Sequence, residues 1–267
     1  MTFAVEAYTQ GDRFQLEKRR LFARAWLPFC AAGQLARAGD FVSHTLGGWP
    51  LFAIRGADGV ARGFRNVCRH QGMPVVERPS GQCDALRCRY HGWTYDLTGA
   101  LTAAPPQVAP SDPTAALHHL DALGLVETDG IIHLRDRDGD DAPPSDVGAA
   151  GLDFVAAHSR DVDANWKTVI EWQLADAAWR FVWPIAFVSE RGASRVVRQV
   201  VPRSFTRTRL VDLVFGSADD ALAAQAQRAQ TSAQELQKAR AAGDGGPESS
   251  AVAAFRDRLA TALAIAE

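Results

Sequence analysis

The sequence has no hydrophobic run that approaches the roughly 18 residues needed to cross a bilayer. It also does not open with a basic stretch and an apolar core, which a secretory signal peptide would need. We therefore expect a cytoplasmic protein with no membrane partner. Its charges nearly cancel, with 29 Lys and Arg against 31 Asp and Glu, so no nucleic-acid partner is indicated either.

Cysteine and histidine are scarce, and the histidines are unevenly placed. The chain has four cysteines and seven histidines in 267 residues, and no histidine follows His158. Four cysteines in a chain of this length are poor evidence for disulfides in a reducing compartment. Any imidazole ligand that this chain supplies must therefore come from its first 158 residues.

The pattern of apolar residues and turns divides the chain into four parts. Residues 1–35 predict a helical segment, with an amphipathic helix near 11–27, that packs on the C-terminal domain. Residues 36–135 contain short apolar runs separated by Gly-rich and Asp-rich turns, which indicates an antiparallel β domain. Residues 136–151 are acidic and rich in Gly and Pro, and predict a linker. Residues 152–267 predict a second domain.

That second domain should mix helices and strands. A helix is expected at about 164–178, and three strands are expected in "RFVWPIAFV", "SRVVRQVV" and "TRTRLVDLVF". A long polar helix is expected at 218–241. A last helix should begin at Ser249 or Ser250 as N-cap and bury one apolar face, formed by Val252, Phe255, Leu259 and Leu263.

Two short motifs offer metal ligands. Cys68-Arg69-His70 and Cys88-Arg89-Tyr90-His91 each supply one thiolate and one imidazole. A single tetrahedral Zn²⁺ can take such a set, and a chance meeting of buried cysteines and histidines is the remaining alternative. Mixed loops suit a Rieske [2Fe-2S] cluster better, since two cysteines hold one iron and two histidines the other. Gly72 and Gly92 follow the ligands and allow tight turns.

The segments "NVCRHQGMPV" and "LRCRYHGWTYDLTGAL" resemble the cluster loops of the Rieske non-haem iron oxygenases, the family of aromatic-ring-hydroxylating dioxygenase alpha subunits. "AAPPQ" at 103–107 resembles the loop that shields the cluster in that family. The resemblance implies an α+β fold. An all-β Rieske [2Fe-2S] domain at 36–135 would be followed by a shortened helix-grip (START-like) α/β domain of catalytic type at 152–267. Respiratory Rieske proteins carry extra cysteines where Met73 and Tyr90 stand here.

The family also binds a mononuclear iron in its second domain, and this chain departs from that pattern. Asn165, Trp166, Lys167 and Glu171 match the start of the iron motif. The positions of its two histidines hold Trp179 and Pro184, or Ala178 and Trp183 in the alternative alignment. We therefore expect no mononuclear iron, and a truncated catalytic-type domain. Asp176 matches a bridging carboxylate of the family and would be a relic of it. An ordinary surface or capping aspartate is the preferred interpretation.

These features predict an auxiliary, electron-transferring subunit of a hetero-oligomeric Rieske oxygenase that is not catalytic on its own. Cys68, His70, Cys88 and His91 would hold the [2Fe-2S] cluster, and a full-length Rieske oxygenase subunit would receive its electrons. A reductase or ferredoxin would be the electron donor. The alternatives are a free-standing carrier that resembles a Rieske ferredoxin, and a non-catalytic scaffold subunit with a structural cluster. His118 and His119 are expected to be a surface pair.

Overall fold

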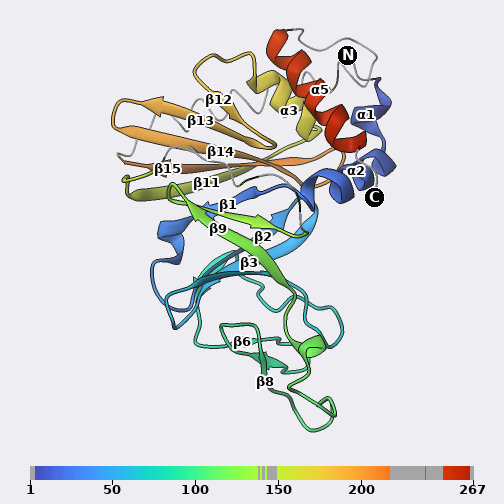
Figure 1. The fold of residues 1–267 in the computed structure, drawn as a ribbon, viewed down its shortest axis with the longest axis vertical. Helices are drawn as coiled ribbons and strands as arrows, with labels where there is room; N and C mark the ends of the chain where they lie inside the picture. Colours follow the sequence, from blue (N-terminus) through green and yellow to red (C-terminus); the bar gives the residue numbers. More distant parts are fainter. Residues whose placement is uncertain are drawn as a thin grey trace.

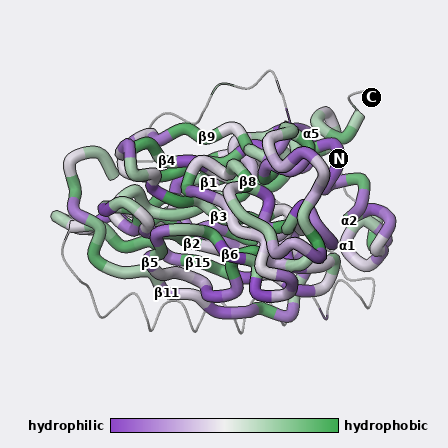
Figure 2. Tube along the Cα trace, turned by 90° about the horizontal axis from the view of Figure 1, so that it is seen from below, coloured by the Kyte–Doolittle hydropathy of each residue, from purple (hydrophilic) through white to green (hydrophobic). Residues whose placement is uncertain are grey.

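A computed structural model of the chain describes residues 4–137, 139, 142, 149–216, 238 and 249–264. The described part contains three antiparallel sheets (Figure 1). A five-stranded sheet lies at the top of the view, with helices at one end of it. A seven-stranded sheet follows below, and a small three-stranded sheet lies at the bottom. In Figure 2 hydrophobic and hydrophilic stretches interleave along most of the strands.

The N-terminal segment forms helical turns before the first strand. These are α1 (Glu6–Thr9), α2 (Gly11–Glu17) and the π-helical turn η1 (Lys18–Phe22). The amphipathic helix expected near 11–27 is formed by α2 and η1, which follow each other directly, and it ends at Phe22, before the strand that begins at Leu27. Residues 27–31, which the sequence placed in the helical segment, form the first strand of the seven-stranded sheet.

Seven strands form the largest sheet, in the order β1–β10–β9–β4–β3–β2–β5. All of its neighbouring strands are antiparallel. The strands are β1 (Leu27–Ala31), β2 (Asp40–Leu46), β3 (Trp49–Arg55), β4 (Ala61–Arg65), β5 (Ser80–Gln82), β9 (Ala122–Thr128) and β10 (Ile131–Arg135). A short 3-10 helix, η2 (Ala32–Leu35), connects β1 to the rest of the domain.

The three-stranded sheet carries the second of the two ligand motifs. It consists of β6 (Leu86–Arg87), β7 (Thr94–Tyr95) and β8 (Leu101–Ala103), in that order. A 3-10 turn, η3 (Ala116–His118), lies between β8 and β9 in the chain. Cys88 directly follows β6, and His91 precedes β7, so the motif forms the loop between these two strands.

The second domain is a five-stranded sheet in the order β11–β15–β14–β13–β12. Its elements are β11 (Phe154–Val162), α3 (Trp166–Gln173), β12 (Arg180–Val182), β13 (Ala186–Arg191), β14 (Ser194–Pro202) and β15 (Thr208–Phe215). The sequence did not predict β11. It also treated 180–188 as one strand, whereas Pro184 lacks the N–H needed to continue a ladder, and the segment forms the β12–β13 hairpin.

The last helix confirms its predicted start and face. The helix α5 (Ser250–Ala264) follows Ser249, whose hydroxyl accepts a hydrogen bond from the backbone N–H of Val252 at 3.2 Å. All four apolar residues predicted for its inner face are buried: Val252, Phe255, Leu259 and Leu263. The polar helix predicted at 218–241 lies almost wholly outside the described residues, as does most of the linker at 136–151.

Two buried ion pairs attach the N-terminal helices and α5 to α3. The Lys167 ammonium lies 2.6 Å from the Glu17 carboxylate, which also accepts a hydrogen bond from the Trp166 indole at 2.8 Å. Burial lowers the pKa of Lys167, and the Glu17 carboxylate opposes that shift. Glu171 accepts hydrogen bonds from Arg256 and from the Tyr8 hydroxyl. The segment before β1 is therefore fixed against the second domain.

One apolar core joins the two large sheets. It includes Phe29 and Leu51 from the seven-stranded sheet together with Val162 and Phe187 from the five-stranded sheet. A separate core lies under the small sheet, and it contains both motif cysteines and Tyr95. The expected α+β class is confirmed, and the ligand motifs lie at the end of the molecule that is remote from α3 and α5 (Figure 1).

Candidate metal centre

The first ligand loop is held by hydrogen bonds between its own backbone groups. The N–H of Cys68 donates to the carbonyl of Met73 at 2.7 Å, and the N–H of Gly72 donates back to the carbonyl of Cys68 at 2.9 Å. Gly72 adopts φ 78°, a conformation that favours glycine. His70 therefore lies at the turn of a closed loop.

The second loop repeats this pattern. The N–H of Cys88 donates to the carbonyl of Trp93 at 2.9 Å, and that of Gly92 donates to the carbonyl of Cys88 at 2.9 Å. Gly92 has φ 75°, and a Cβ there would lie 3.2 Å from the ring of Pro105. Pro105 belongs to the predicted shielding loop, so this loop packs directly on the second ligand loop. Both glycines are thus required by turn geometry, as the sequence predicted.

The four candidate ligands form two pairs of like side chains. The Cys68 and Cys88 thiols are both buried and lie close enough to influence each other's ionisation; burial is the main cause that raises the pKa of Cys88, and the neighbouring Cys68 raises it further. The backbone N–H groups of Tyr90 and His91 act in the opposite direction and lower that pKa. The imidazoles of His70 and His91 are only partly buried, and their ring centroids lie 4.7 Å apart.

This arrangement fits a cluster with two different ends. In the part of the chain that the structure describes, no group of three or more His, Cys, Asp or Glu side chains lies together as ligands for one metal ion. His70 Nδ1 is buried and has no hydrogen-bond partner in the protein. A buried ring nitrogen without a partner is costly unless it binds something. The nitrogen is therefore a suitable ligand atom for an iron beside the cysteine pair.

Tyr95 is a contact of the site that the sequence did not single out. Its hydroxyl lies 3.2 Å from Cys68 Sγ and accepts a hydrogen bond from the backbone N–H of Arg69 at 3.1 Å. Because that hydroxyl is already an acceptor for Arg69, its own proton is free to point at the sulfur. Burial and the contact with Cys68 raise the pKa of Tyr95, so the hydroxyl keeps its proton.

A stack of rings fixes the histidine end. The Trp93 indole lies nearly parallel to the His70 ring, with 5.1 Å between centroids, and donates a hydrogen bond to the Val108 carbonyl at 2.9 Å. The His118 ring packs edge-on against the same Trp93 indole, with 5.6 Å between centroids. The sequence treated His118 as part of a surface pair, but the fold brings it against Trp93, the ring that stacks on His70.

Asn66 holds the segment that follows the first loop. Its amide group accepts hydrogen bonds from the backbone N–H groups of Val75 and Val76 and donates one to the Val76 carbonyl at 2.6 Å. Asn66 is buried, and it lies two residues before Cys68 in the sequence. A polar side chain before the first cysteine is a signal that could have identified it as a support of the loop.

Exposed apolar side chains lie near His70, His91 and His118 in the sequence. Met73 is 39% exposed, Tyr90 is 60% exposed and Leu117 is 63% exposed. Tyr90 packs edge-on against His91, with 4.7 Å between centroids. Large exposed apolar residues of this kind indicate a contact surface when they gather in one place.

Charged and aromatic side chains fill the second domain where the resemblance implied iron ligands. Trp179 is buried, and the Arg198 guanidinium lies 4.3 Å from its ring centroid. Arg198 forms two hydrogen bonds with Asp212, at 2.8 and 2.9 Å, and one with Gln173 at 2.7 Å. Arg160 also contacts Asp212 at 3.1 Å. A guanidinium and a carboxylate thus occupy the interior next to Trp179.

Asp176 lies in the turn after α3 and caps that turn. Its carboxylate accepts a hydrogen bond from the backbone N–H of Ala178 at 3.0 Å, and its carbonyl accepts one from Trp179 at 3.1 Å. Trp183 lies apart from it, against Phe255 and the Arg258 guanidinium of α5. The capping function that the sequence favoured for Asp176 is present, and the bridging role stays a prediction.

Two further histidines, His44 and His133, and two further cysteines, Cys30 and Cys83, lie outside the two ligand loops. His44 stacks on Phe29 with 4.1 Å between centroids, and both of its ring nitrogens contact backbone carbonyls. His133 is completely buried in β10. Cys30 is buried, whereas Cys83 is partly exposed. No helix among the described residues is both long and apolar enough to cross a membrane.

Comparison with known proteins agrees with the geometry of the loops. The sequence model of the protein family described as "Rieske [2Fe-2S] domain" matches residues 25–121 of this chain. Benzene 1,2-dioxygenase subunit alpha of Pseudomonas putida (strain F1) is 39% identical over 98 residues, which are 37% of this chain and 22% of that protein. The alpha subunit of 2-aminobenzenesulfonate 2,3-dioxygenase from an Alcaligenes species is 32% identical over 180 residues, 62% of this chain and 45% of that protein.

The whole described fold also has counterparts among solved structures. The apo form of the quaternary ammonium Rieske monooxygenase CntA matches with a TM-score of 0.80 and 19% identity, over 98% of this chain and 95% of that one. This likeness concerns the fold. The chain spans less than half the length of the two curated relatives named above. The chain therefore carries a Rieske [2Fe-2S] domain and is a relative of the alpha subunits of Rieske non-haem iron oxygenases, aromatic-ring dioxygenases included.

Proposed function

We propose that this chain is an auxiliary, electron-transferring subunit of a hetero-oligomeric Rieske oxygenase. Cys68 and Cys88 would hold one iron of the [2Fe-2S] cluster, and His70 and His91 would hold the other. The observation that carries the proposal is the asymmetry of the site, with buried cysteines and partly exposed histidines. An electron that resides on the histidine-bound iron would lie next to the surface, where a partner can approach.

The surroundings of the histidines support a docking role for this surface. Met73, Tyr90 and Leu117 are exposed apolar residues of the Rieske domain. Contact with a partner would bury them, and burial of apolar area contributes about 25 cal/mol per Å². The partner that we propose is a full-length Rieske oxygenase subunit, and a reductase or ferredoxin would supply the electrons.

The second domain supports a role without its own iron. The positions expected for iron histidines hold aromatic or small residues, and Trp179 packs on the Arg198–Asp212 pair. The guanidinium groups of Arg198 and Arg160 share the single carboxylate of Asp212, and the net positive charge of this group would repel a metal cation in the buried interior. We infer that the oxygen and substrate chemistry takes place on the partner, and that this chain is not catalytic alone.

The decisive experiment expresses the chain with and without a complete oxygenase relative from the same source. Co-purification followed by mass determination should show a mixed assembly, and turnover should need both chains. Cys88→Ser should remove the cluster, keep the assembly and slow turnover. Cys83→Ser, a matched change at a cysteine outside the ligand loops, should leave the cluster and turnover intact.

The results separate the alternative functions. Unchanged turnover in Cys88→Ser would favour a scaffold with a structural cluster. A monomer that exchanges electrons rapidly and never joins an oxygenase would favour a free-standing carrier. Full oxygenase activity from this chain alone would contradict the proposal.

A further inference from the structure

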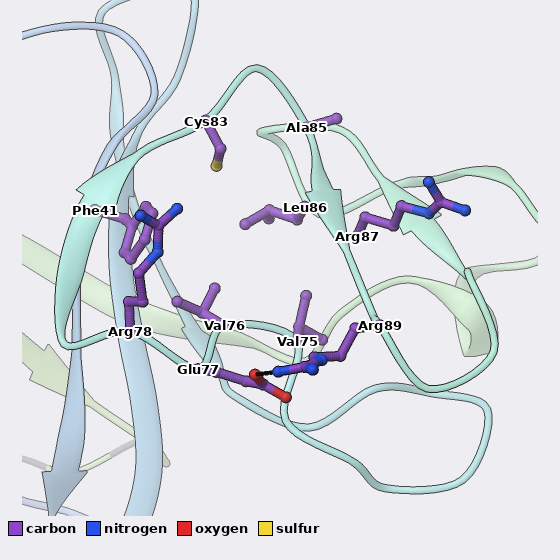
Figure 3. A pocket seen from close by; sticks show the side chains of 10 residues that line it. All are labelled: Phe41, Val75, Val76, Glu77, Arg78, Cys83, Ala85, Leu86, Arg87 and Arg89. Atoms are coloured by element: carbon purple, nitrogen blue, oxygen red, sulfur yellow. Dashed lines mark hydrogen bonds and ion pairs between the residues drawn. The ribbon is translucent and has the colours of Figure 1, made fainter.

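A cavity of about 420 Å³ opens on the Rieske domain next to the second ligand loop (Figure 3). Its walls come from β2, from the segment after the first loop, and from the chain around β6. The lining residues are Phe41, Val75, Val76, Glu77, Arg78, and then Cys83, Ala85, Leu86, Arg87 and Arg89. Neither His70 nor His91 lines the cavity, so it is separate from the two partly exposed histidines of the ligand loops.

The floor of this cavity is apolar. Phe41, Val76 and Leu86 are each less than a tenth exposed, and their side chains face the cavity in Figure 3. The sulfur of Cys83 points into the same space. Burial raises the pKa of Cys83, so its thiol stays neutral and adds a polarisable apolar surface. The floor can therefore accept a hydrocarbon group.

The rim is basic, and its arginines are not equivalent. Arg89 is paired with Glu77, as the dashed line in Figure 3 marks. Arg78 extends beside Phe41 toward the open space, and it forms no ion pair with any residue that the structure describes. Arg87 belongs to the lining, but its guanidinium extends away from the open space and lies near Gly92. One uncompensated guanidinium, that of Arg78, thus lies next to the apolar floor.

We propose that this cavity binds a small organic anion, an aryl or short acyl carboxylate. Its hydrocarbon part would lie on Phe41, Val76 and Leu86, and its carboxylate would pair with the Arg78 guanidinium. Guanidinium groups bind carboxylates through two parallel hydrogen bonds, which gives direction as well as affinity. A cavity of roughly 150 Å³ is sufficient for benzene, so 420 Å³ leaves room for a ring and its carboxylate.

The position of the cavity links such a ligand to the metal centre. Val75 and Val76 follow the first ligand loop and are held by Asn66, whereas Arg87 and Arg89 flank Cys88. A bound anion would contact segments that carry both loops, without covering the histidines. The site can therefore be occupied while a partner docks at the histidine end.

Calorimetric titration of the cluster-loaded full chain with benzoate tests the proposal. Benzoate should bind saturably, with one site per chain. Benzamide, which has the same ring without the charge, and acetate, which lacks the ring, should each bind at least about tenfold more weakly, a ratio equivalent to about 1.4 kcal/mol. Arg78→Gln should weaken benzoate binding by about tenfold, because the charged partner is lost.

Arg87→Gln is the matched control, since it removes the same charge from a side chain that faces away from the cavity. Benzoate affinity should change by less than about twofold in that variant. Both arginines are exposed, so the variants should keep the visible absorption of the cluster. Absence of saturable benzoate binding, or equal weakening by Arg78→Gln and Arg87→Gln, would overturn the proposal. These results do not depend on whether the cluster transfers electrons to an oxygenase.

Discussion

The hydroxyl of Tyr95 lies 3.2 Å from Cys68 Sγ, and the same oxygen accepts a hydrogen bond from the Arg69 backbone. The tyrosine is buried under the ligand loops, and Cys68 belongs to the same apolar core. This contact couples a residue of the small sheet to the sulfur of the first loop. Hydrogen bonds to cluster sulfurs are among the determinants of iron–sulfur potentials.

Tyr95→Phe should lower the reduction potential of the cluster. A hydrogen bond to the sulfur stabilises the electron-rich reduced state, and a difference of about 1 kcal/mol corresponds to roughly 40 mV for one electron. Protein-film voltammetry would measure the shift. Tyr90→Phe is the control, because its exposed ring packs on His91 and its change should leave the potential nearly unchanged. Equal potentials for wild type and Tyr95→Phe would contradict this role.

His70→Ala and His91→Ala should each abolish the Rieske-type electron paramagnetic resonance signal of the reduced protein. Each imidazole would supply one of the protein ligands of a [2Fe-2S] cluster, so its loss leaves an iron incompletely held. The wild-type chain should be red-brown and contain iron and inorganic sulfide in equal amounts. His119→Ala, outside both loops, should keep the signal. Stoichiometric zinc without sulfide would refute the cluster assignment.

The buried ion pair in the second domain should be essential for its stability. Asp212→Asn would leave the Arg198 and Arg160 guanidinium groups without their shared carboxylate, and removal of one partner of a buried pair costs about 3–5 kcal/mol. Asp163→Asn is a suitable control, because the Arg207–Asp163 pair is mostly exposed and such pairs contribute less than about 1 kcal/mol. Urea denaturation of both variants would measure the difference. A small loss in Asp212→Asn would show that this interior tolerates unpaired charge.

His133 should make the chain sensitive to acid. Burial lowers its pKa to about 4, while an unfolded histidine has its usual pKa near 6.5. Between these values the unfolded chain binds more protons, so stability is complete above about pH 6.5 and falls as the pH decreases toward 4. From pH 7 to pH 5 the loss should be about 2 kcal/mol.

Replacement of His133 by Leu isolates this contribution. Neither ring nitrogen of His133 has a hydrogen-bond partner of normal geometry, so a leucine loses no polar contact there. The His133→Leu chain should lose about 2 kcal/mol less than the wild type between pH 7 and pH 5, as measured by urea denaturation at each pH. An identical loss in both chains would contradict the proposed pH sensitivity.

Local patterns were sufficient for the features that depend on neighbours in the chain. The two Cys-x-His and Cys-x-x-His motifs, the glycines that follow them and the buried face of α5 were all visible in the residues themselves. Their geometry depends on turns of a few residues or on helical periodicity, and both are properties of a short segment. The missing histidines after His158 were equally evident from the sequence.

Other features arose only from tertiary structure. The pairing of Cys68 with Cys88, the Tyr95 contact, the approach of His118 to Trp93 and the Arg198–Asp212 pair join residues that no local pattern connects. The same holds for the cavity beside Arg78, whose walls come from three separate segments. The sequence by itself determined which ligands and turns are present. Only the packing of the sheets decided which side chains meet, because distances between remote residues depend on the register and stacking of every strand between them.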